Sequence, residues 1–165
     1  MKAIVVYESL WGNTAAIARA VAEGIGPEAR ALSTAEATPA AAGDADLVVA
    51  GAPVLGFSLP TEQMRESIRA NPGKAPATPD LSAPSMRSWL ETLPSGSGRF
   101  AAFETRIWWS PGSATSGIAR GLSGAGYRPV SEPHRFVVTG RWGPLREGEI
   151  ERARAWGADL AKAMA

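Results

Sequence analysis

Residues 3–18 read AIVVYESLWGNTAAIA, and they decide the fold. The first five letters form a continuous apolar run rich in β-branched residues, as expected of a strand that helices cover on both faces of a parallel sheet. After the loop Glu8–Asn13, apolar residues recur at helical spacing as far as Ile25, and Gly26 with Pro27 ends the helix. The stretch therefore predicts one strand-loop-helix unit.

The rest of the chain repeats this alternation of strands and helices. Four more apolar runs predict strands at Glu28–Leu32, Asp46–Gly51, Arg99–Phe103 and Arg135–Thr139. Helices are predicted at Met86–Leu93, Ala114–Gly126 and Glu149–Met164. Strands that alternate with helices predict an α/β protein with a five-stranded, doubly wound parallel sheet. We expect one domain, residues 1–165, with helices on both faces of the sheet.

The segment Ser58–Pro84 interrupts the alternation. It contains five prolines, which prevent a long helix, although Thr61–Ala70 is able to form a short one. We therefore expect a long irregular loop that covers one edge of the site, rather than a linker between domains.

Composition excludes several kinds of site. The chain has no Cys and a single His, His134, which excludes disulfides, thiolate metal sites, a cysteine nucleophile and a His-rich metal centre. Lys and Arg number 17 against 16 Asp and Glu, a net charge too small to indicate a nucleic-acid binder. No stretch approaches the roughly 20 apolar residues that span a bilayer. We expect a soluble, cytoplasmic protein that does not act at a membrane.

The loops that follow the strands are the places to seek a ligand, because open α/β sheets bind ligands at the carboxyl ends of their strands. The first such loop carries hydroxyls at Ser9 and Thr14, an amide at Asn13, a small residue at Gly12 and the N-terminus of a helix. Free N–H groups at a helix N-terminus bind phosphate without any Lys or Arg. The loop therefore predicts a phosphate site.

The same loop argues against three other ligand classes. It lacks the lysine of the nucleoside-triphosphate loop and the glycine spacing of dinucleotide-binding loops. The third predicted strand ends in Ala50-Gly51, so it offers no aspartate for phosphorylation of the response-regulator kind. A triphosphate site, an NAD site and a receiver domain are therefore not expected.

Residues 5–18 resemble, position for position, the phosphate-loop signature of flavodoxins. The resemblance implies a three-layer sandwich with strand order 2-1-3-4-5 and non-covalently bound FMN. It places the FMN phosphate on Ser9, Leu10, Trp11, Gly12, Asn13 and Thr14. Trp11 has a second possible position, along the ribityl chain.

In flavodoxins, two further loops hold the flavin ring between them. The resemblance maps these loops onto Ala52–Ser58 and Glu104–Trp109. Either Leu55 or Phe57 then covers one face of the ring, and either Trp108 or Trp109 covers the other. The candidate ring contacts are Pro53, Val54, Leu55, Gly56, Phe57, Glu104, Thr105, Arg106, Trp108 and Trp109. The resemblance implies neither a catalytic side chain nor a metal, because the chemistry is that of the flavin.

Three functions remain open. We favour an electron carrier that serves a redox partner protein or a small electron acceptor. The alternatives are an FMN-dependent reductase of the NAD(P)H:quinone type and a flavin-free anion-binding or regulatory domain of the same fold. The nearly neutral charge and Arg106 predict that the reduced, anionic flavin is less destabilised than in acidic carriers. The oligomeric state is left open.

Overall fold

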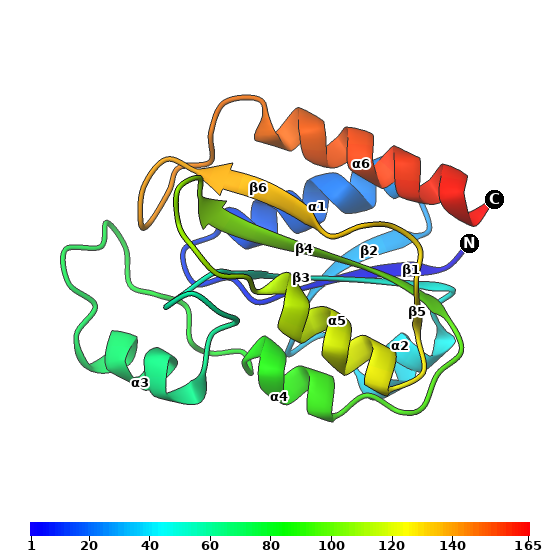
Figure 1. The fold of residues 1–165 in the computed structure, drawn as a ribbon, viewed down its shortest axis with the longest axis horizontal. Coiled ribbons are helices and arrows are strands. Elements are labelled where there is room, and N and C mark those ends of the chain that lie inside the picture. The colour runs from blue at the N-terminus through cyan, green and yellow to red at the C-terminus, as the bar shows by residue number, and fades with distance from the viewer.

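The computed structural model describes residues 1–165 and consists of a parallel sheet between two layers of helices (Figure 1). The strands are β1 (Ala3–Tyr7), β2 (Ala29–Ser33), β3 (Leu47–Pro53), β4 (Arg99–Ile107), β5 (Arg128–Pro129) and β6 (His134–Val138). The helices are α1 (Asn13–Ile25), α2 (Pro39–Asp44), α3 (Glu62–Ala70), α4 (Met86–Glu91), α5 (Thr115–Gly124) and α6 (Glu149–Met164). No helix is long and apolar enough to cross a bilayer.

The strand order is β2-β1-β3-β4, and both β5 and β6 pair with β4. This confirms the predicted order 2-1-3-4-5 but corrects the number of strands from five to six. β5 pairs with Arg99 and Phe100, whereas β6 pairs with the later residues Phe103–Ile107. The two short strands thus succeed one another along the same side of β4. Pro133 precedes β6 and has no N–H to donate to a strand ladder, which is consistent with this break.

The two faces of the sheet explain why the β1 sequence is apolar throughout. Ile4 and Val6 belong to one buried cluster, and Ala3 and Val5 belong to another. Side chains alternate between the faces of a strand, so a strand that is covered on both faces has no polar position. Helices α4 and α5 contribute to the first cluster, and α1 and α6 contribute to the second.

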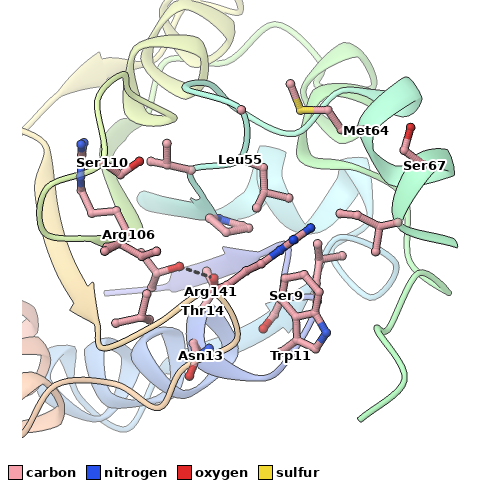
Figure 2. Close-up of a pocket in the computed structure, with 18 residues that line it drawn as sticks. Ser9, Trp11, Asn13, Thr14, Leu55, Met64, Ser67, Arg106, Ser110 and Arg141 are labelled. Atoms are coloured by element: carbon pink, nitrogen blue, oxygen red, sulfur yellow. Dashed lines mark hydrogen bonds between the residues drawn. The ribbon is translucent and has the colours of Figure 1, made fainter. Parts of the chain in front are cut away.

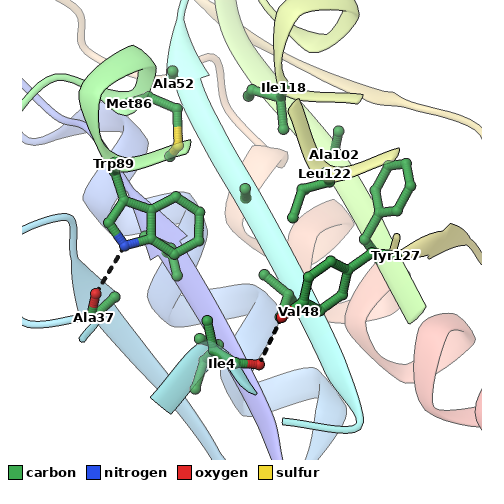
Figure 3. Close-up of a cluster of buried hydrophobic side chains, with 14 of the residues drawn as sticks. Ile4, Ala37, Val48, Ala52, Met86, Trp89, Ala102, Ile118, Leu122 and Tyr127 are labelled. Carbon is green, nitrogen blue, oxygen red and sulfur yellow. Dashed lines mark hydrogen bonds between the residues drawn. The ribbon is translucent and has the colours of Figure 1, made fainter. Parts of the chain in front are cut away.

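Trp89 and Trp156 are core residues, as their helical spacing predicts. The Trp89 indole N–H donates a hydrogen bond to the Ala37 carbonyl at 2.8 Å (Figure 3). Trp156 packs edge-on against Phe103, with their ring centroids 6.1 Å apart. Each helix layer thus adds one tryptophan to a core that also contains Phe100 on the first face and Phe103 and Phe136 on the second.

Helices α1 and α6 lie side by side on their face of the sheet and approach each other at a glycine (Figure 1). A Cβ atom added to Gly157 would lie 2.3 Å from the Val21 carbonyl oxygen. No larger residue fits this crossing without separating the helices.

Two elements differ from the sequence predictions, and one short helix is confirmed. β4 continues four residues past Phe103, because Glu104 and Thr105 pair with β3 and Glu104–Ile107 pair with β6. Helix α2 was not predicted, whereas α3 confirms the short helix within the proline-rich segment. This segment places α3 beyond the carboxyl ends of the strands (Figure 1).

Candidate cofactor-binding site

A cavity of about 420 Å³ lies at the carboxyl edge of the sheet (Figure 2). This volume is within the range typical of small-molecule sites. Its lining comes from the loop after β1 and the start of α1, from the ends of β3, β4 and β6 with the loops that follow them, and from helix α3. The eighteen lining residues are Ser9, Leu10, Trp11, Asn13, Thr14, Pro53, Val54, Leu55, Gly56, Met64, Ser67, Ile68, Thr105, Arg106, Ile107, Ser110, Val138 and Arg141.

The loop after β1 is folded around the side chain of Ser9. The Ser9 hydroxyl oxygen accepts hydrogen bonds from the N–H groups of Gly12 and Ala15, each at 3.2 Å. Gly12 has φ 94°, in the left-handed region that glycine adopts without strain. The N–H groups of Asn13 and Thr14, the first two residues of α1, donate to no protein acceptor. They are therefore available to an anion at the positive end of the helix dipole.

Side-chain hydrogen bonds join the start of α1 to two other parts of the cavity wall. The buried Thr14 hydroxyl lies 2.8 Å from the Thr105 hydroxyl on β4 (Figure 2). The Asn13 amide donates to the Trp142 carbonyl at 3.1 Å, in the loop after β6. These two contacts fix the N-terminus of α1 relative to the sheet and to the last loop.

The loop after β3 forms a tight turn whose base lines the cavity. Val54 donates its N–H to the Thr105 carbonyl at 3.0 Å, and Leu55 and Ser58 exchange backbone hydrogen bonds at 2.9 and 3.1 Å. Pro53 ends β3 and lines the cavity with Val54 and Leu55. Phe57 lies at the tip of the turn, outside the lining, and is 65% exposed.

Glu104 and Arg106 lie in strand β4, not in the loop Glu104–Trp109 onto which the resemblance maps them. The fully buried Glu104 carboxylate accepts hydrogen bonds from Arg106 at 2.7 Å and from the Ala114 and Thr115 N–H groups at 3.0 and 3.1 Å. Burial acts to raise the pKa of Glu104, but these hydrogen bonds outweigh it and hold the pKa below its usual value. Glu104 thus supports the N-terminus of α5, and only Arg106 of the pair lines the cavity.

The two adjacent tryptophans after β4 do not line the cavity. Trp108 and Trp109 are 76% and 65% exposed, and neither belongs to the lining. Trp11 does line the cavity, and its indole N–H has no hydrogen-bond partner. Of the aromatic candidates in the three loops, the structure brings only Trp11 to the cavity wall.

Several lining residues are absent from the sequence prediction. Met64, Ser67 and Ile68 come from α3, and Arg141 comes from the loop after β6. The signal for Arg141 was its position just after the last strand, at the same edge as the other loops. The segment Ser58–Pro84 was expected to cover one edge of the site, and α3 within it does line the cavity. Which residues of α3 face the cavity could not be predicted, because the position of the helix depends on a tertiary contact.

That tertiary contact is a buried ion pair between Glu8 and Arg65. Their side chains meet at 2.7 Å, and the Glu8 carboxylate also accepts the Met86 N–H at 3.0 Å. Arg65 donates in addition to the Ala83 carbonyl at 2.5 Å. Burial raises the pKa of Glu8, although its hydrogen bonds to Met86 and Arg65 oppose the shift. The pair joins α3 to the end of β1 and so fixes the wall above the cavity.

No family model matches the chain, and no curated protein matches its sequence. Solved structures do match its fold. The chain superposes over 99% of its length on 99% of a flavodoxin from the domain Archaea, with TM-score 0.68 and 22% identity. A Streptococcus pneumonia TIGR4 flavodoxin gives TM-score 0.70 and 18% identity over 100% of both chains.

A larger protein contains a similar unit. The Flv1 flavodiiron core from Synechocystis sp. PCC6803 matches 99% of this chain with 36% of its own length, at TM-score 0.64 and 19% identity. The agreement in strand order, helix layers and full-length coverage shows that the chain has the flavodoxin fold.

Proposed function

We propose that the chain binds FMN non-covalently and acts as an electron-transfer protein. The observation that carries this proposal is the pair of unpartnered N–H groups on Asn13 and Thr14, which border a cavity at the carboxyl edge of a flavodoxin-like sheet. Such groups bind a phosphate through hydrogen bonds and the helix dipole. Solved flavodoxins with the same fold support the choice of FMN as the ligand.

The chemistry of the lining fits FMN. The phosphate would bind at the loop from Ser9 to Thr14, where donors are free and no carboxylate is present. The ring would lie between the loop after β3, at Leu55, and the end of β4, at Arg106 and Ile107. Apolar side chains on both sides exclude water from a flat, largely apolar group.

The lining residues bind and orient rather than transfer protons. No carboxyl, imidazole or thiol group is among them, and the two charged side chains are the guanidinium groups of Arg106 and Arg141. Bound FMN would supply the redox chemistry, and the protein would set its position and electrostatic surroundings. This lining supports an electron carrier, whose acceptor we propose to be a redox partner protein or a small molecule in the cytoplasm.

An absorption spectrum tests the proposal. Purified protein is mixed with FMN, desalted and scanned in the visible range, where we expect flavin bands to remain. The variant Ser9→Ala with Thr14→Ala should bind FMN at least about 10-fold more weakly, because it loses the acceptor that shapes the loop and a hydroxyl at its end. The control is Ser95→Ala, which removes an exposed hydroxyl far from the cavity.

Two outcomes would change the assignment. If the wild type retains no flavin at micromolar concentration, the electron-transfer function is wrong and the anion-binding domain becomes the better hypothesis. If FMN-loaded protein is bleached by NADPH under anaerobic conditions, the chain is a reductase rather than a carrier.

A further inference from the structure

The charged side chains of the cavity lining are two arginines, without any acidic residue. Arg106 is 7% exposed and paired with the buried carboxylate of Glu104, so its charge is largely neutralised. Arg141 forms no ion pair; its guanidinium lies over the Trp142 ring, 5.7 Å from the ring centroid. The cavity therefore carries one uncompensated positive charge, which favours an anionic ligand.

The loop that carries Arg141 is fixed against the start of α1. The N–H and the hydroxyl of Thr139 both donate hydrogen bonds to the Pro144 carbonyl, at 2.8 and 2.9 Å. These two bonds close the loop. The Asn13 amide then donates to the Trp142 carbonyl within that loop. These bonds hold residue 141 next to the free N–H groups of Asn13 and Thr14.

The Arg141 side chain extends into the cavity. Figure 2 shows it passing above Thr14 toward the space between Trp11 and Leu55. The side chain is exposed and long, so its guanidinium is able to swing toward the phosphate loop without moving the backbone. Guanidinium groups bind phosphate through two parallel hydrogen bonds, which a neutral hydroxyl cannot replace.

We propose that Arg141 recognises the phosphate of the ligand and makes the cavity select FMN over riboflavin. This inference rests on the proposed function, because it takes the ligand to be a flavin. It assigns to the loop after β6 the cation that the loop from Ser9 to Thr14 lacks. The phosphate is then held from two sides, by the N-terminus of α1 and by the Arg141 guanidinium.

The test compares the affinities of two flavins that differ only in the phosphate. FMN and riboflavin are titrated by fluorescence quenching against wild type, Arg141→Ala and Arg141→Lys at low and high salt. Arg141→Ala should weaken FMN about 10-fold at low salt and change riboflavin less than about 2-fold, as expected for loss of a charge-assisted contact. Arg141→Lys should recover part of the FMN affinity, because it keeps the charge but not the paired donors.

A matched variant controls for net charge. Arg120→Ala removes an exposed arginine from α5, outside the cavity lining, and should leave both affinities unchanged. The salt dependence of FMN binding should also become shallower in Arg141→Ala and stay as in wild type in Arg120→Ala.

The outcomes separate this inference from the proposed function. Equal losses for FMN and riboflavin in Arg141→Ala would show that Arg141 acts on the ring or on the loop, and would overturn phosphate recognition while leaving flavin binding intact. Unchanged FMN affinity in Arg141→Ala would also overturn it. A wild type that binds neither flavin would overturn both the proposed function and this inference.

Discussion

The ion pair between Glu104 and Arg106 gives a stability prediction that the structure makes quantitative. Both side chains are buried, at 0% and 7% exposure, and they meet at 2.7 Å. The substitution Glu104→Gln removes the negative charge but keeps an oxygen that can accept the Ala114 and Thr115 N–H groups. The variant is then less stable mainly because Arg106 stays charged and buried without the carboxylate that paired with it. Breaking a buried pair from one side costs roughly 3–5 kcal/mol, so we expect a loss of about 3 kcal/mol.

Urea unfolding followed by circular dichroism measures this loss as a lower midpoint at unchanged slope. The double variant Glu104→Gln with Arg106→Met should be more stable than Glu104→Gln alone, since it also removes the unpaired charge. The pKa of Glu104 is lowered in the folded protein, so its stabilising contribution is complete above the ordinary value of 4.5 and is lost as the pH falls through the folded-state value. A loss below about 1 kcal/mol in Glu104→Gln at pH 7 would refute the reasoning.

Two other features give predictions of known sign. Gly157→Ala should destabilise the protein by roughly 1–3 kcal/mol, because the added Cβ meets the Val21 carbonyl oxygen. Gly124→Ala places its Cβ in open space and should stabilise the protein by up to about 1 kcal/mol through helix propensity. Urea unfolding of both variants measures the two free-energy changes. Burial against Trp156, with a contribution from the charge of Arg152, lowers the pKa of His134. Stability should therefore fall as pH drops below 6.5, and an NMR titration of this single imidazole should give a pKa below 6.5; a higher value would contradict the packing.

The sheet and the loop after β1 could be predicted because their signals are local. The apolar run Ala3–Tyr7 requires burial on both faces wherever it is placed, and the helix from Asn13 follows within a few residues. A ligand site at the end of β1 then follows from the geometry of parallel sheets. Local sequence was therefore enough to predict that Ser9, Asn13 and Thr14 line the cavity.

The remaining parts of the site depend on contacts between distant residues. Glu104 and Arg106 were expected in the loop after the strand. They are buried in β4 because they pair with each other and because the N-terminus of α5 supplies two donors to Glu104. Arg141 is brought to the start of α1 by a hydrogen bond between residues 129 positions apart. The sequence also cannot show that Trp108 and Trp109 face solvent, because adjacent side chains in a loop have no fixed periodicity.

The buried ion pair of Glu8 and Arg65 holds one wall of the cavity in place before any ligand binds. Helix α3 forms one wall, and moving it outward would separate two charges that have little access to water. We therefore expect that wall to keep its position when a ligand binds, so that the width of the cavity is set when the protein folds. A ligand that fits meets a preorganised surface, so less of its interaction energy is lost to rearranging the protein.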